Sequence, residues 1–253
     1  EVSRHTANSC KSPPSAAMLR IWRLSGQELT ASADEFADAA ALKQHLCEQY
    51  GFPVCLQHLL HEGNHLSDGA ELDASMELQL SISGLSESNS RLAEKEFLKA
   101  AAQNRGKVVL SLLEAGVATD FRDPSGKTAL MLACEHGHLE TVSLLLRAGA
   151  DKTCENNAGN TALMFASNRG DWQVVRLLLE AGGHTKKDYR NHEGMTALMH
   201  AAAGGHGWVV RLLLDAGASI NILNERGKTA LGLALEGSHF AVAQIFFGAA
   251  ASW

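Results

Sequence analysis

Apolar and polar positions in the second half of the chain recur with a period of about 33 residues. The pattern Gly-x-Thr-Ala-Leu begins at Gly126, Gly159, Gly194 and Gly227, and an apolar run follows each copy. These runs place apolar residues at i, i+3 and i+4, which is the spacing of one helix face. Helices of this length are not stable alone. The period therefore predicts helix pairs that bury their apolar faces against neighbouring copies.

The copy that begins at Gly126 illustrates the expected elements. The hydroxyl of Thr128 is placed to cap a first helix, and Gly137 is placed to end it in the left-handed conformation. A second helix is expected from about Leu139, and Gly149 stops it. The polar residues that follow predict a connector that leads to the next copy.

Residues 18–85 show a different pattern. Leu78, Leu80 and Ile82 alternate with polar residues, which predicts a half-buried strand. A similar alternation at the start predicts two further strands, and apolar residues at i, i+3 and i+7 predict a helix over 39–50. The expected order is β-β-α-β-β, which describes a domain separate from the repeats.

The repeats resemble the ankyrin family. The residues that carry the resemblance are Thr-Ala-Leu-Met-x-Ala, then Gly-His, then Val-x-Leu-Leu-Leu-x-Ala-Gly-Ala. The family has Thr-Pro-Leu-His where this chain has Thr-Ala-Leu-Met. Met131, Met164 and Met199 therefore replace a histidine that ties adjacent connectors, and we expect a slightly softer array. The resemblance implies an all-α solenoid that binds proteins.

About five repeat units are expected, in a solenoid that spans residues 91–253. The first unit is degenerate, because Lys95 stands where the capping Thr is expected. The third full unit gains two residues in its connector, where extra length is tolerated. The predicted units are 91–123, 124–156, 157–191, 192–224 and 225–253.

The segment 18–85 resembles ubiquitin. The matching residues are Lys43, Gly51-Phe-Pro53, Gln57-His-Leu-Leu60, Gly63, Leu66-Ser-Asp68-Gly69, Leu72 and Leu78-Gln-Leu80. The resemblance implies an α+β ubiquitin-like (β-grasp) domain, joined by a linker at 86–90 to the repeats. No di-glycine follows Ile82, so we expect no conjugation to other proteins. Leu60 matches one member of ubiquitin's recognition patch, but Ser81 replaces another.

Charge is distributed unevenly along the chain. The net charge is −6. Residues 18–85 hold ten acidic and three basic residues, a net of −7, whereas residues 86–253 hold seventeen of each. A nucleic-acid-binding protein needs a basic surface, so we expect no nucleic-acid partner. The acidic head could instead attract a basic protein. No apolar run is long enough to cross a membrane.

The cysteine content bears on the compartment. The five cysteines are odd in number and follow no spacing pattern, which suits a reducing environment. We expect a cytoplasmic protein, with a nuclear location as an alternative. Residues 1–17 are interpreted as a disordered extension before Met18; a targeting peptide that directs import into an organelle is the other interpretation.

Two groups of residues are candidates for a catalytic or metal site. His58, His61 and His65 lie near Cys55, but metal binding would require several of them to converge on one ion. Cys134 precedes His136 and His138, yet it falls where repeats of this kind pack small residues. We interpret His58, His61 and His65 as surface histidines and Cys134 as a packed cysteine. We expect no catalytic residue, no cofactor and no metal, and a cysteine- or metal-dependent enzyme is the remote alternative.

The expected binding surface lies on the connector tips and the exposed ends of the first helices, the concave face of an ankyrin-like array. Tyr189 and Trp208 add aromatic character, which interfaces favour, whereas Trp172 is expected to be packed. The predicted protein-binding residues are Lys127, Glu135, His136, Asn157, Asn160, Asn168, Arg169, Tyr189, His192, Met195, Trp208, Glu225, Arg226 and Lys228.

These observations favour a non-enzymatic adaptor. The array would hold one unidentified protein while the ubiquitin-like head recruits another. The final unit lacks charged residues after Glu236, and Phe246, Phe247 and Trp253 predict a second docking surface for self-association. The alternative is a structural subunit that docks into a larger assembly through this apolar end.

Overall fold

A computed structural model describes residues 18–250, except 24, 33–34, 74–75 and 182–186. Residues 1–17 and Trp253, on which two of the sequence-based expectations rest, lie outside the described residues. The chain separates into two compact units. The first comprises Glu1–Leu46 and Gln57–Ser83, and the second comprises Cys47–Leu56 and Gly84–Trp253.

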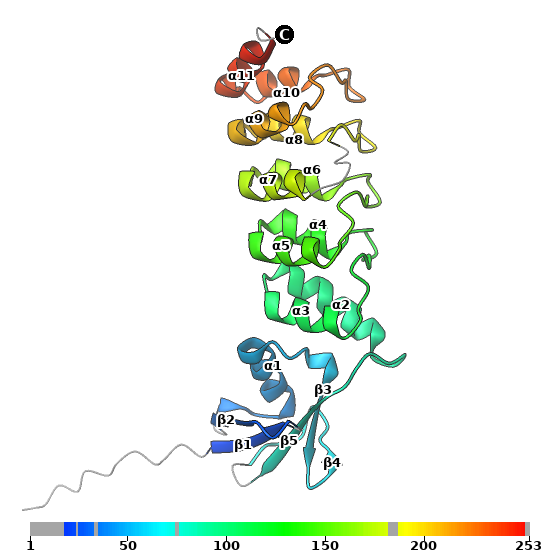
Figure 1. Cartoon of the computed structure of the whole chain (residues 1–253), viewed down its shortest axis with the longest axis vertical. Helices are drawn as coiled ribbons and strands as arrows, with labels where there is room; N and C mark the ends of the chain where they lie inside the picture. Colours follow the sequence, from blue (N-terminus) through cyan, green and yellow to red (C-terminus); the bar gives the residue numbers. More distant parts are fainter. Residues whose placement is uncertain (1–17, 24, 33–34, 74–75, 182–186, 251–253) are drawn as a thin grey trace, which may run out of the picture. The chain divides into compact units, whose positions relative to one another are not determined.

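The head is a five-stranded sheet covered on one face by a helix (Figure 1). The strand order is β2-β1-β5-β3-β4; β1 and β5 run parallel, and the other neighbours are antiparallel. This arrangement is the β-grasp fold that the sequence predicted, with a short extra strand, β4. The elements between residues 18 and 82 are β1 (Met18–Arg23), β2 (Glu28–Ser32), α1 (Ala39–Tyr50), the 3-10 turn η2 (Val54–Leu56), β3 (Gln57–His61), β4 (Asn64–His65) and β5 (Glu77–Ile82); η2 and the end of α1 fall in the second unit.

Alternation along the strands builds the core of the head. Leu78 and Leu80 of β5 are buried, whereas Gln79 between them is exposed. Leu42 and Leu46 lie one turn apart on α1 and are fully buried. The helix stripe and the alternating strand residues therefore supply two apolar faces that pack together, as their periodicities predict.

Five helix pairs stack in the described part of the second unit, and their connectors lie along one side of the stack (Figure 1). The first helix of each pair contacts the first helix of the next pair, and the second helices do the same. The pairs are α2 (Ser90–Ala102) with α3 (Gly106–Glu114), α4 (Ala129–His136) with α5 (Leu139–Arg147), α6 (Ala162–Arg169) with α7 (Trp172–Glu180), α8 (Ala197–Ala203) with α9 (Gly207–Asp215), and α10 (Ala230–Glu236) with α11 (Phe240–Ala250).

Local capping follows the sequence prediction. The hydroxyl of Thr128 accepts a hydrogen bond from the backbone N–H of Met131 at 3.4 Å, and Gly137 ends α4 with φ of 72°. Thr161, Thr196 and Thr229 cap their helices in the same way. These caps satisfy amides that a helix of eight residues cannot pair internally.

The first pair departs from the predicted register at its start. Its first helix, α2, begins at Ser90, so Lys95 lies inside the helix instead of at its beginning. The side chain of Asn89 accepts from the N–H of Ser86 at 2.7 Å and closes the turn before the helix. Without a capping Thr at position 95, nothing in the sequence ends the helix on its N-terminal side there.

The core of the array runs between the helix layers. Ala133, Ala166, Ala201 and Ala234 occupy one position of successive first helices and have no exposed surface. Small residues at this position allow neighbouring helices to approach closely. The second helices contribute one large residue each to the core, at Leu112, Leu145, Leu178, Leu213 and Phe246.

Candidate protein-binding surface

The connectors form a hydrogen-bonded ladder along one edge of the array. The N–H of Asn157 donates to the carbonyl of Ser125, and the N–H of His192 donates to the carbonyl of Ala158, both at 3.0 Å. The N–H of Glu225 continues the ladder to Glu193 at 3.0 Å. Because backbone groups hold adjacent connectors in register, side chains at equivalent positions form rows on one surface.

A recurring Asp or Asn shapes each connector tip. In the third connector, the side-chain oxygen of Asn191 accepts from the N–H groups of Glu193 and Met195, at 3.0 and 2.8 Å. The equivalent residues are Asp123, Asn156 and Asn224. These residues recur three residues before each Gly-x-Thr, a signal that is visible in the sequence although it was not among the predicted features. For Asp123, burial opposes ionisation, but hydrogen bonds from Ser125 and Lys127 outweigh it and lower the pKa of the carboxyl.

Two features require glycine in the connectors: the backbone is left-handed there, and a Cβ would collide with the next connector. Gly194 has φ of 72°, and a Cβ there would lie 2.8 Å from the backbone nitrogen of Glu225. Gly126 is similarly crowded, at 2.8 Å from the nitrogen of Asn157. Gly227 has φ of 69°, but no atom of the described residues lies within 4 Å of the position that its Cβ would take. Close approach of successive connectors therefore explains the glycine in the repeated motif.

Several predicted binding residues are occupied by contacts inside the array. The ammonium of Lys127 lies 2.7 Å from the carboxylate of Glu135 and 5.0 Å from the ring centre of Phe165. Lys228 forms the equivalent ion pair with Glu236. These lysines are held between connector and helix, so their charges are partly neutralised on the surface.

Two predicted asparagines tie neighbouring connectors. The side-chain nitrogen of Asn157 donates to the carbonyl of Pro124 at 2.9 Å. The side-chain oxygen of Asn160 accepts from Asn191 at 2.8 Å. Both therefore contribute to the ladder, whatever else they contact.

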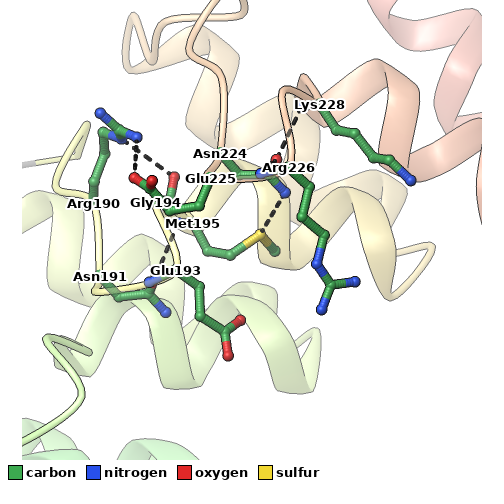
Figure 2. Close-up of polar contacts among 9 residues, drawn as sticks. All are labelled: Arg190, Asn191, Glu193, Gly194, Met195, Asn224, Glu225, Arg226 and Lys228. Atoms are coloured by element: carbon green, nitrogen blue, oxygen red, sulfur yellow. Dashed lines mark hydrogen bonds and ion pairs between the residues drawn. The ribbon is translucent and has the colours of Figure 1, made fainter.

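Glu225 is also paired within the array. Arg190 reaches it from the preceding connector, with 3.0 Å between guanidinium and carboxylate (Figure 2). Met195 lies between the same two connectors, where its sulfur accepts from the side chain of Asn224 at 3.5 Å (Figure 2).

Three predicted residues on successive units are exposed, and their side chains make no polar or ring contact within the described residues. Asn168, His192 and Arg226 are exposed, and within the described residues none of their side chains makes a hydrogen bond or ion pair. Figure 2 shows the side chain of Arg226 extending away from the ladder, as does that of Glu193 on the neighbouring connector. These three side chains lie at the last turn of α6 and at the tips of two connectors.

A second set of side chains ties the helix pairs together. Nε2 of His138, at the start of α5, donates to the carbonyl of Ala102 in the preceding pair at 2.9 Å. His206 and His239 make the same bond to Asn168 and Ala203, at 2.9 and 3.0 Å. The histidines that recur at this position therefore have a structural role.

Arg169 replaces the histidine in the pair where Asp171 stands at that position. Its guanidinium lies 2.7 Å from the Asp171 carboxylate and donates to the carbonyl of Glu135 at 3.4 Å. A residue expected to contact a partner thus completes the series of ties between pairs.

The remaining predicted residues differ in position. His136 is exposed at the end of α4 and stacks on His138, and Tyr189 is half-buried in a connector. Trp208 belongs to the second helix α9, where 73% of it is exposed beside the guanidinium of Arg211. The expectation that Trp172 is packed is wrong, because 43% of it is exposed at the first position of α7.

Phe165 and His200 join the candidate surface without having been predicted. Both are half-buried at the fourth position of a first helix, where other units have Leu132 and Leu233. Nε2 of His200 is buried and has no hydrogen-bond partner in the described chain. Burial lowers the pKa of His200, and Glu193 partly opposes this shift.

The candidate catalytic and metal-binding residues lie in the core of the array and on the head. Cys134 is fully buried in α4, and burial raises the pKa of its thiol well above the ordinary value. The rings of His58 and His65 lie 5.4 Å apart on the head. In the described part of the chain, no three His, Cys, Asp or Glu residues are arranged to hold a metal ion.

The head offers an accessible apolar surface of its own. Trp22 of β1 and Leu60 of β3 are both in register with Gln79 of β5, so the three side chains share one face of the sheet. Trp22 is 36% exposed and Leu60 is half-buried. Leu60 is the residue that matches part of ubiquitin's recognition patch.

Comparison with known families agrees with the stacked helix pairs. A family model described as "Ankyrin repeats (3 copies)" matches residues 97–189 and 181–252, which is more than half of the chain. The chain belongs to the ankyrin-repeat family. Its connectors, capping threonines and helix pairs are those of an ankyrin array, and arrays of this family bind proteins. No helix in the described ranges combines the length and apolarity needed to cross a membrane.

Curated relatives match the ankyrin repeats over short stretches. A segment of 40 residues is 55% identical to "Ankyrin repeat domain-containing protein 63" of Homo sapiens, covering 16% of this chain and 10% of that protein. A segment of 43 residues is 51% identical to "Probable E3 ubiquitin-protein ligase XBOS32" of Oryza sativa subsp. japonica, covering 17% and 9%. The chain thus matches about a tenth of the length of these relatives.

Proposed function

We propose that this ankyrin-repeat protein is a non-enzymatic adaptor in the cytoplasm, whose array holds one protein while its ubiquitin-like head recruits another. The observation that supports the array's role is the connector ladder. It holds the connectors that carry His192 and Arg226 in register, and the side chains of both residues, like that of Asn168 at the last turn of α6, are accessible. A rigid surface with free polar groups binds a partner without first ordering itself, which reduces the entropic cost of association.

The head's role rests on its charge and on the face that carries Trp22 and Leu60. The net charge of −7 over residues 18–85 favours a basic partner, and the exposed aromatic ring provides a contact area that interfaces favour. The ligase activity named for the rice relative is not carried over, since that match covers 43 residues of repeat.

Two variants of the full chain test the adaptor. The array variant replaces Asn168, His192 and Arg226 with Ala, and the head variant replaces Trp22 and Leu60 with Ser. Affinity purification from the native cell, with quantitative mass spectrometry, should show that each variant loses a different set of partners. Unchanged circular dichroism would confirm that both variants are folded. Partners that all survive the array variant would contradict binding by the connector surface.

A structural subunit is the second candidate, favoured by the apolar C-terminal end. Phe246 is buried in the core, whereas Phe247 is 60% exposed and Leu235 is 45% exposed. Leu235 stands where earlier units have Cys134, Ser167 and Ala202, all fully buried by the next pair. In this case both variants would copurify with the same stoichiometric complex, and a Phe247→Glu variant would be released from it.

A further inference from the structure

A hollow of about 430 Å³ lies between the second helices α9 and α11 of the array. It is separate from the connector ladder, since no connector residue lines it. Its lining comprises Arg211, Leu214 and Asp215 of α9, with Ala241, Gln244, Ile245 and Gly248 of α11.

The hollow exists because one of its two sides carries small residues, Ala241 and Gly248, at two of three ridge positions. Trp208, Arg211 and Asp215 are spaced i, i+3 and i+7 and form a tall ridge on α9. The equivalent positions of α11 are Ala241, Gln244 and Gly248, whereas α7 has Gln173, Arg176 and Glu180 there. Half-buried Leu214 and Ile245 form the apolar floor between the ridges.

The polar groups on the α9 ridge have no ionic partner within the described residues. Arg211 stacks on Trp208, with its guanidinium carbon 5.8 Å from the ring centre, and makes no ion pair. Asp215 lies one helical turn further along and is also unpaired. The matching arginine of the previous unit, Arg176, stacks on Trp172 at 5.4 Å but reaches Glu180 at 3.7 Å.

We propose that this groove binds an amphipathic helix of a partner protein, which places an acidic side chain against Arg211 and apolar side chains over Leu214 and Ile245. An apolar floor between two helices accepts a helix by its apolar face. The free Arg211 selects an acidic residue by charge complementarity, and Asp215 selects a basic residue one turn away. Exposed Trp and Arg are the side chains that most often dominate binding energy.

Fluorescence anisotropy with labelled helical peptides tests this proposal. The probe is a peptide of about 15 residues, a length at which helix formation is feasible in water, with a Leu stripe flanked by a Glu and, four residues on, a Lys. A second peptide carries Lys in place of that Glu. Wild-type protein should bind the Glu peptide about fivefold more tightly than the Lys peptide, the upper range for an exposed ion pair.

Three variants separate the groove from general stickiness. Arg211→Glu should reverse the preference between the two peptides. Ala241→Trp, which copies Trp208 at the equivalent position of α9, should fill the groove and abolish binding of both. Arg176→Glu is the matched control, because it changes the same helical position one unit away and should leave both affinities unchanged.

Three results would overturn the proposal. They are no binding of either peptide up to about 1 mM, equal loss with Arg176→Glu and Arg211→Glu, and binding that survives Ala241→Trp. A different outcome is that the chain self-associates in a way that Ala241→Trp abolishes and Phe247→Glu leaves intact. That result would assign the groove to a second copy of the chain. Failure here leaves the connector surface untouched, since Asn168, His192 and Arg226 are all outside the groove.

Discussion

At the scale of single residues, a pair of glycines separates two contributions to stability: the close approach of a neighbouring connector and the left-handed backbone conformation. Gly194 and Gly227 share the left-handed conformation and the same place in the repeated motif. Only Gly194 faces the backbone of a following connector. The comparison therefore isolates the energetic effect of close connector packing.

Gly227→Ala should lower the free energy of unfolding by about 1–2 kcal/mol, the strain of a left-handed non-glycine residue. Gly194→Ala should cost about 1–3 kcal/mol more, because its Cβ would also collide with the Glu225 nitrogen 2.8 Å away. Urea denaturation of both variants measures the difference. Equal losses would show that the connectors separate freely to make room.

His200 makes the array sensitive to acid. Burial lowers its pKa in the folded protein, so the neutral imidazole is favoured there and the unfolded chain binds the proton more readily. The contribution of this residue is complete above the unfolded pKa of about 6.5 and is lost as the pH falls through the folded pKa. As the pH is lowered below 6.5, the free energy of unfolding should fall more for the wild type than for the His200→Leu variant. Parallel pH profiles for the two proteins would contradict this assignment.

At the scale of elements, the side-chain ties between helix pairs explain why single short helices persist. The first helices α2, α4, α6 and α8 leave carbonyl groups at their C-termini, and a histidine or Arg169 of the next pair donates to one of them. The bond belongs to two units at once. The same hydrogen bond therefore caps a helix of one pair and holds the next pair against it.

His206→Ala should reduce the free energy of unfolding by about 1 kcal/mol, the typical net contribution of such a hydrogen bond. His192→Ala is the control, because this histidine is exposed on a connector and its change should stay within about 0.5 kcal/mol. Denaturant unfolding followed by circular dichroism measures both. An equally small effect for His206 would mean that water replaces the tie at no cost.

At the scale of the whole molecule, two adjacent residues at the apolar end of the array differ in burial: Phe246 lies in the core and Phe247 on the surface. Phe246→Ala should destabilise the protein by about 3–5 kcal/mol, because it removes a large side chain that is 3% exposed. Phe247 is 60% exposed, so Phe247→Glu should leave stability nearly unchanged while removing an apolar contact area.

Self-association through this end predicts concentration-dependent sedimentation of the wild type and monomeric behaviour of Phe247→Glu. Analytical ultracentrifugation of both proteins at matched concentrations provides the test. A wild type that remains monomeric over the whole range would restrict the exposed residues to binding another protein. Trp253 lies beyond the described residues, so the test is built on Phe247.

The sequence by itself determined the elements and the order of the two domains. Helix caps such as Thr128 and the i, i+3, i+4 stripes act within a few residues, and so does strand alternation at Leu78 and Leu80. Local interactions of this kind are legible in a linear pattern. The repeated motif added the stacking, because each unit must bury its apolar face on a neighbour.

Only the tertiary structure decided which surface residues are free. The bond from Arg169 spans 34 residues to Glu135, and that from Asn191 spans 31 residues to Asn160. Such contacts depend on how two units lie side by side, so neither residue type nor position in one repeat reveals them. The groove between α9 and α11 has the same origin, since small residues on one helix become a hollow only beside the tall ridge of another.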